Sequence, residues 1–131
     1  MTTAVDTNVV LRWITRDDPV QAALADPVFD KPVVITTTVL LETEWVLRGR
    51  RYAMQRNTIA TLLEQIAETT TVTREHENGA RWALERYRLG TDFADMIHLV
   101  VPAEASRFVT FDRRLARHAG TDAPLAIETL A

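Results

Sequence analysis

The chain has 131 residues and no cysteine, so disulfide bonds and thiolate chemistry are excluded. No run of residues approaches the roughly 20 consecutive apolar side chains that a membrane-spanning helix needs. The N-terminus lacks a basic region followed by an apolar one, which argues against a secretory signal. We therefore expect a cytoplasmic protein that does not bind membranes, built as a single domain over residues 1–131.

Lysine is nearly absent, because Lys31 is the only one among 15 basic residues. The net charge of −3 is not that of an evident nucleic-acid-binding protein. If four acidic residues form a metal site, however, the remaining charges nearly balance, and Arg guanidinium groups suit phosphate recognition. A general preference for Arg over Lys explains the same composition without any functional role.

Strand and helix signals alternate along the chain. Short β-branched or apolar runs predict strands over residues 2–6, 33–35, 69–73, 108–110 and 125–127. Helical spacing and capping signals predict helices directly after Asp6, from Pro19, over 38–50, 56–68 and 75–89, from 92, and over 113–118. This alternation predicts an α/β sandwich with a mainly parallel central sheet.

Two aspartates follow apolar strands. Asp6 ends the first predicted strand, which we expect to be buried, and Asp112 follows the strand over 108–110. Ligands of open α/β sheets bind at the carboxyl ends of the strands. Each carboxylate is therefore either a hydrogen-bonded end cap or a functional group, and the answer depends on whether other acids converge there.

The helix predicted over 38–50 carries two glutamates on opposite faces. At about 100° per residue, Glu42 lies in the middle of a stripe formed by Val39, Trp45 and Val46. Glu44 lies on the far side, four residues before Arg48, as an exposed helix pair would. An acid that faces the core is costly unless it is paired or binds a metal, so Glu42 is either a buried salt-bridge partner or a metal ligand.

Asp92 and Asp95 begin another predicted helix and are about 60° apart around it. Either could face Asp6. Asp92 could instead be the N-cap, with Asp95 in the first turn favouring the helix dipole, and this reading needs no metal. An all-oxygen cluster of Asp6, Glu42, Asp95 and Asp112 would suit Mg²⁺ or Mn²⁺, whereas no His or Cys spacing indicates zinc.

A basic segment ends the helix predicted over 38–50. Arg48, Arg50 and Arg51 precede Tyr52 and form the densest basic patch of the chain. These side chains could bind RNA phosphates. They could equally stabilise the C-terminal end of the helix dipole.

The motifs, taken in order, resemble those of PIN-domain proteins and, more narrowly, of VapC toxins from bacterial type II toxin–antitoxin pairs. The segments that carry the resemblance are Val5 to Asn8, Val39 to Leu47, Asp92 to Ile97 and Val109 to Asp112. They span nearly the whole chain. His98 to Pro102 departs from the small, Ala-rich continuation usual after the third acid.

The resemblance implies a PIN-like three-layer α/β/α sandwich and a Mg²⁺- or Mn²⁺-dependent ribonuclease. It assigns Asp6, Glu42, Asp95 and Asp112 to metal binding and catalysis. It gives Asn8 and Thr110 supporting roles. Because Asp95, the acid directly before Met96, matches the third carboxylate of the family, Asp92 is left as a helix cap that contacts the metal site only from its outer shell. It also implies a homodimer that is neutralised by a cognate VapB-type antitoxin.

Two other classes fit the sequence less well. A phosphate-transferring hydrolase of the haloacid-dehalogenase type would need a second Asp where Asn8 stands, and a Lys that Lys31 is poorly placed to supply. A non-catalytic α/β binding module would show no metal dependence of stability or of any activity.

Overall fold

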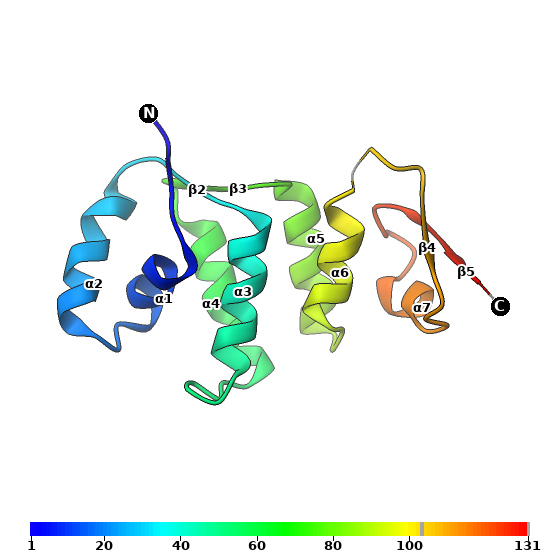
Figure 1. Ribbon diagram of the computed structural model, residues 1–131, viewed down its shortest axis with the longest axis horizontal. Coiled ribbons are helices and arrows are strands. Elements are labelled where there is room, and N and C mark those ends of the chain that lie inside the picture. The colour runs from blue at the N-terminus through cyan, green and yellow to red at the C-terminus, as the bar shows by residue number, and fades with distance from the viewer. Residues whose placement is uncertain (103, 131) are drawn as a thin grey trace. The chain divides into compact units, whose positions relative to one another are not determined.

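The computed structural model describes residues 1–102 and 104–130, and it shows the predicted alternation of helices and strands (Figure 1). Its elements in chain order are β1 (Thr3–Ala4), α1 (Thr7–Thr15), α2 (Pro19–Ala25), the 3-10 helix η1 (Asp26–Asp30), β2 (Val33–Ile35), α3 (Thr37–Arg48), α4 (Arg56–Glu68), β3 (Val72–Arg74), α5 (Glu77–Arg88), α6 (Phe93–Val100), β4 (Arg107–Thr110), α7 (Leu115–Ala119) and β5 (Ala126–Thr129).

The chain comprises two compact units, residues 1–75 and 76–131. The first contains a sheet of order β1-β2-β3, and the second contains the pair β4-β5. Every pair of neighbouring strands is parallel. The predicted α/β class with a mainly parallel sheet is confirmed. The prediction of a single domain over residues 1–131 stays a prediction.

Some predicted boundaries are confirmed and others move. Strand β2 and helix α4 have the predicted bounds, and α2 begins at Pro19 after its N-cap Asp18, whose side chain accepts from the backbone N–H of Gln21. Strand β3 begins at Val72, three residues later than predicted. Strand β1 is only two residues long, and both are exposed, so the expectation of a buried first strand is wrong.

In the first unit, α1 packs against α2 and α3. Trp13 of α1 stacks on Phe29 of η1 with ring centroids 3.8 Å apart. The spacing of Val20, Ala23 and Leu24 predicts that these residues form the inward-facing side of α2. This prediction is wrong, because Ala22 and Ala25 are buried whereas Val20 and Leu24 are 71% and 70% exposed. Small alanine side chains allow α2 to approach its neighbours closely, and its larger apolar side chains face outward.

In the second unit, α5 packs closely against α6. A Cβ atom at Gly79 would lie 2.5 Å from Cγ1 of Val100, so these helices meet where residue 79 has no side chain. Tyr87 and Phe93 add an edge-to-face ring contact at 5.4 Å between centroids. Helix α6 ends at Val100, before Pro102, so the proline terminates the element rather than kinking it.

No helix in the described part of the chain is long and apolar enough to cross a membrane.

Candidate active site

Asp6 lies two residues after β1 and begins helix α1 as its N-cap. Its Oδ1 accepts a hydrogen bond from the backbone N–H of Val9 at 3.1 Å. Among the residues that the structure describes, Oδ2 of Asp6 has no hydrogen-bond or ion-pair partner. The carboxylate is exposed, so one oxygen orients it through the cap and the other is available to a ligand.

Glu42 is held by a residue that the sequence reasoning missed. The Thr7 hydroxyl, next to Asp6, donates to Oε1 of Glu42. Thr7 is buried and Glu42 is exposed. The signal was the position of Thr7 between Asp6 and Asn8, yet spacing alone does not reveal a contact between α1 and α3.

The predicted orientation of α3 is wrong. Glu44 is 2% exposed and Trp45 is 64% exposed, so Glu44 faces the core and Trp45 faces solvent. The buried stripe contains Leu40, Thr43 and Leu47 instead of the three side chains around Glu42. Core burial therefore gives no reason to assign Glu42 to a metal, and its assignment rests on the resemblance and on its contact with Thr7.

Two local hydrogen bonds make the polar face of α3 compatible with burial. Thr43 Oγ1 donates to the carbonyl oxygen of Val39 at 2.7 Å. Arg48 Nε donates to Oε2 of Glu44 at 2.9 Å, in the predicted i,i+4 pair, with the Arg48 side chain 53% exposed. The pair was predicted correctly, but it lies at the edge of the core rather than on the solvated side.

In the second unit, Asp92 is the N-cap of α6, as predicted. Its Oδ1 accepts from the backbone N–H of Asp95 at 3.0 Å. Asp95 lies in the first turn of α6, and its side chain is only partly exposed. Capping accounts for Asp92 but leaves the Asp95 carboxylate without a hydrogen-bond partner among the described residues.

Burial raises the pKa of the Asp95 carboxyl above its ordinary value, and the carboxylates of Asp92 and Asp112 raise it further. The His98 and His118 side chains act in the opposite direction, but the net effect is a raised pKa, so burial and the neighbouring carboxylates outweigh them. Repulsion between the carboxylates favours a bound cation or a bound proton.

Asp112 follows β4 and is oriented by its neighbours. Its backbone N–H donates to Oγ1 of Thr110 at 2.9 Å, and its Oδ1 accepts from the backbone N–H of Arg114 at 2.9 Å. Thr110, predicted to support the acids, thus fixes the backbone of one of them. Asn8, the other predicted supporting residue, is exposed and lines a cavity beside Asp6.

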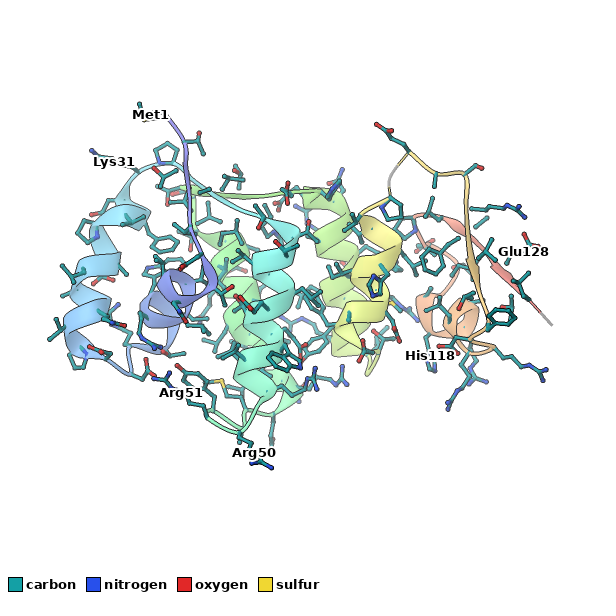
Figure 2. The ribbon with its side chains drawn as sticks, in the orientation of Figure 1. Met1, Lys31, Arg50, Arg51, His118 and Glu128 are labelled. Atoms are coloured by element: carbon teal, nitrogen blue, oxygen red, sulfur yellow. The ribbon has the colours of Figure 1, made fainter. Side chains whose placement is uncertain are left out.

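The three arginines of the predicted RNA-binding patch differ in their surroundings. Arg48 pairs with Glu44, and Arg51 Nη2 lies 2.9 Å from Oδ2 of Asp17. Arg50 lies on the loop after α3 and extends away from the ribbon (Figure 2). Since two of the three guanidinium groups already have acidic partners within the chain, RNA binding by this patch stays a prediction.

The donor set fits a hard divalent cation. All four predicted ligands supply carboxylate oxygens, which Mg²⁺ and Mn²⁺ prefer. Asp6 and Glu42 lie in the first unit, and Asp95 and Asp112 lie in the second. Among residues 1–102 and 104–130, neither unit alone brings together three or more His, Cys, Asp or Glu side chains that could hold a metal ion. The four-acid site thus stays a prediction.

A comparison with protein-family models finds a match to the PIN domain over residues 3–121. The match spans both units. PIN domains are generally metal-dependent nucleases, which are hydrolases, so the match supports that class of activity. No curated protein and no solved structure matches the chain at a comparable level.

Proposed function

Because the chain belongs to the PIN domain family, we propose that it is an endoribonuclease that requires Mg²⁺ or Mn²⁺ and cleaves RNA phosphodiesters with water. Asp6, Glu42, Asp95 and Asp112 are the proposed metal-binding and catalytic residues. The observation that carries this proposal is the contact between Thr7 and Glu42, since it joins the helix that begins at Asp6 to the helix that bears the second acid.

The chain's own residues hold and orient the carboxylates. The N-cap bond to Val9 fixes one oxygen of Asp6, and Thr7 fixes one oxygen of Glu42. In the second unit, Thr110 sets the backbone at Asp112. If bound by such carboxylates, a divalent cation would lower the pKa of a water molecule and would offset negative charge on the phosphate.

The finer proposal is that the protein is the VapC-type toxin of a toxin–antitoxin pair, acting in the cytoplasm as a homodimer with a VapB-type antitoxin. The order of the four motifs supports the toxin assignment. The exposed apolar side chains of Val20, Leu24 and Trp45, from α2 and α3, support a role in protein contacts.

Incubation of the purified protein with a mixture of structured RNAs tests the nuclease proposal. We expect cleavage in Mg²⁺ or Mn²⁺, no cleavage in EDTA, and no cleavage by the Asp6→Asn variant. Asp30→Asn is the matched control, because Asp30 is an exposed acid outside the proposed site. Metal-dependent cleavage that persists unchanged in Asp6→Asn would point to a contaminating nuclease and contradict the proposal.

Expression in bacteria tests the toxin proposal. We expect growth arrest from the wild-type chain, none from Asp6→Asn, and rescue by co-expression of the neighbouring gene product if that product is the antitoxin. Light scattering should show a dimer at micromolar concentration. A monomer that arrests no growth and forms no stable complex with that product would contradict the toxin and dimer assignments, while leaving the nuclease proposal to the RNA assay.

A further inference from the structure

A cavity of about 300 Å³ opens beside Asp6, between α1 and the segment formed by α2 and η1. It is lined by Asp6, Asn8, Val9, Arg12, Gln21, Leu24, Ala25 and Val28. All of these residues belong to the first unit. This volume is at the lower end of the usual range for ligand pockets, so it suits a single ring system rather than a longer segment.

The polar wall of this cavity has a fixed hydrogen-bonding direction. Arg12 Nε donates to Oε1 of Gln21 at 2.7 Å. Because a guanidinium group can only donate, the Gln21 amide must turn its oxygen toward Arg12. Its other end, the Nε2 amino group, is then a donor that has no acceptor among the described residues.

Contacts with Tyr52 and Asp17 also fix the position of the Arg12 side chain. Its Nη1 donates to the Tyr52 hydroxyl at 3.1 Å, and the same Nη1 lies 3.4 Å from Oδ1 of Asp17. The Tyr52 hydroxyl donates in turn to Oδ2 of Asp17 at 2.7 Å. Nη2 of Arg12 has no hydrogen-bond partner in the described part of the chain. The wall therefore offers two donor groups, Arg12 Nη2 and Gln21 Nε2, on side chains whose geometry is already fixed.

The remaining lining is mostly apolar. Val9, Leu24, Ala25 and Val28 provide hydrocarbon surface, and Leu24 is 70% exposed. An occupant that fits must have an apolar body and an edge that accepts hydrogen bonds. A nucleobase combines these properties.

We infer that this cavity binds the base of a nucleotide next to the scissile phosphate and selects guanine or uracil, which carry an oxygen at C6 or C4 where adenine and cytosine carry an amino group, with Gln21 and Arg12 as specificity-determining residues. The inference rests on the proposed nuclease function, because Asp6 lies on the wall of the same cavity. Guanine presents O6 and N7 as acceptors, and uracil presents O4. At the same position adenine and cytosine carry an amino group, which donates and cannot accept, so at least one of the two donors would be left unpaired.

The Gln21→Glu variant tests this inference because it reverses one hydrogen-bonding group. A carboxylate accepts from Arg12 at one oxygen and presents an acceptor to the cavity at the other. Cleavage sites mapped in a random RNA pool should show guanine or uracil at one fixed position near the cut for the wild-type protein. In Gln21→Glu, preference at that position should move toward adenine or cytosine by about tenfold.

Gln65→Glu is the matched control, since it makes the same change of charge at an exposed position of α4. Its cleavage profile should equal that of the wild-type protein. A wild-type profile with no base preference, or one that Gln21→Glu leaves unaltered, would overturn the inference and leave the nuclease proposal intact.

Nucleotide binding without metal tests the cavity independently of cleavage. NMR titration with GMP and UMP should shift the Gln21 side-chain amide resonances, whereas AMP, CMP and ribose 5-phosphate should shift them much less. This result would support the cavity even if no RNA were cleaved. Equal shifts with ribose 5-phosphate would assign the donors to phosphate and overturn the base assignment, and so would the absence of any shift. The base assignment would also be overturned if Gln21→Glu abolished binding of a protein partner but left nucleotide binding and base preference unchanged.

Discussion

The Thr7 hydroxyl donates to the carboxylate of Glu42 although 35 positions separate the two residues in the chain. Thr7 is the first residue of α1 and follows the cap residue Asp6, whereas Glu42 lies on α3. One side-chain bond thus connects the two helices that carry the acids of the first unit. This gives Thr7 the role of a positioning residue rather than of a metal ligand.

Replacing Thr7 tests that role. Thr7→Val keeps the shape of the side chain but removes the donor, so RNA cleavage should fall about tenfold or more, in keeping with the loss of a hydrogen bond to a charged group. The Mg²⁺ concentration for half-maximal rate should rise, because Glu42 is no longer oriented. Thr7→Ser should restore both values. If Thr7→Val keeps the wild-type rate and metal dependence, the contact is structural only.

Substitution of Glu42 should affect cleavage, whereas substitution of Glu44 should affect stability. Glu42→Gln should abolish cleavage with little change in melting temperature, because Glu42 is exposed. Glu44→Gln should retain cleavage but lose about 1 kcal/mol of unfolding free energy, since Gln keeps an acceptor for Arg48 but removes the charge that strengthens the hydrogen bond. Urea unfolding and an RNA assay on both variants measure the two effects. A stable but inactive Glu44→Gln protein would reverse the assignment.

Substitutions of Asp92 and Asp95 should also have different effects on stability and on cleavage. Asp92→Ala removes the N-cap of α6 and should cost about 1 kcal/mol while keeping substantial cleavage. Asp95→Asn keeps the shape of the side chain and relieves repulsion around it, so it should fold at least as well as the wild-type protein and lose metal-dependent cleavage. Melting temperature and cleavage on both proteins check this. An active Asp95→Asn beside a folded, inactive Asp92→Ala would exchange their roles.

Metal binding should raise the melting temperature, because a divalent cation offsets the repulsion between carboxylates. Asp6→Asn should lose most of this gain, and the exposed Asp30→Asn should keep it. Differential scanning fluorimetry with and without Mg²⁺ or Mn²⁺ measures the shift. An Asp6→Asn protein with the full metal response would remove Asp6 from the site.

The loop between α1 and α2 should give the protein part of its acid sensitivity. A hydrogen bond from Tyr52, with a second from Thr15, lowers the pKa of Asp17 to about 2. Since the folded pKa is below the unfolded value of about 3.9, ionised Asp17 stabilises the fold above about pH 4, and this stabilisation is lost as the pH falls toward 2. Tyr52→Phe should flatten the decline of stability with pH in this interval, measured by urea unfolding. An unchanged slope would contradict the role of Tyr52.

The sequence predicted elements whose signals are local. The start of a helix at Pro19 and the N-cap Asp92 were read from residue type and position, and the residues that precede these helices, Asp18 and Asp92, both accept a backbone hydrogen bond. The β-branched run Val33–Ile35 forms a strand with the predicted bounds. In each of these cases the stabilising partner lies within a few residues, so no knowledge of the tertiary structure was needed.

Helix faces were less predictable, because burial depends on what a helix meets. On α3, Thr43 and Glu44 are buried since each has a partner within four residues, whereas apolar Trp45 is exposed. On α2, the two small residues Ala22 and Ala25 face inward. Hydrophobicity alone gave the wrong face both times. The contacts of Thr7 and Gln21 were missed for the same reason, since their partners lie on other helices.

The close approach of α5 and α6 at Gly79 and Val100 limits how these two positions can change over evolution. A larger residue at position 79 requires a smaller one at position 100, while shortening Val100 alone leaves a gap between the helices. The pair should therefore covary across relatives of this chain. A substitution at one position is therefore tolerated only together with a compensating change at the other.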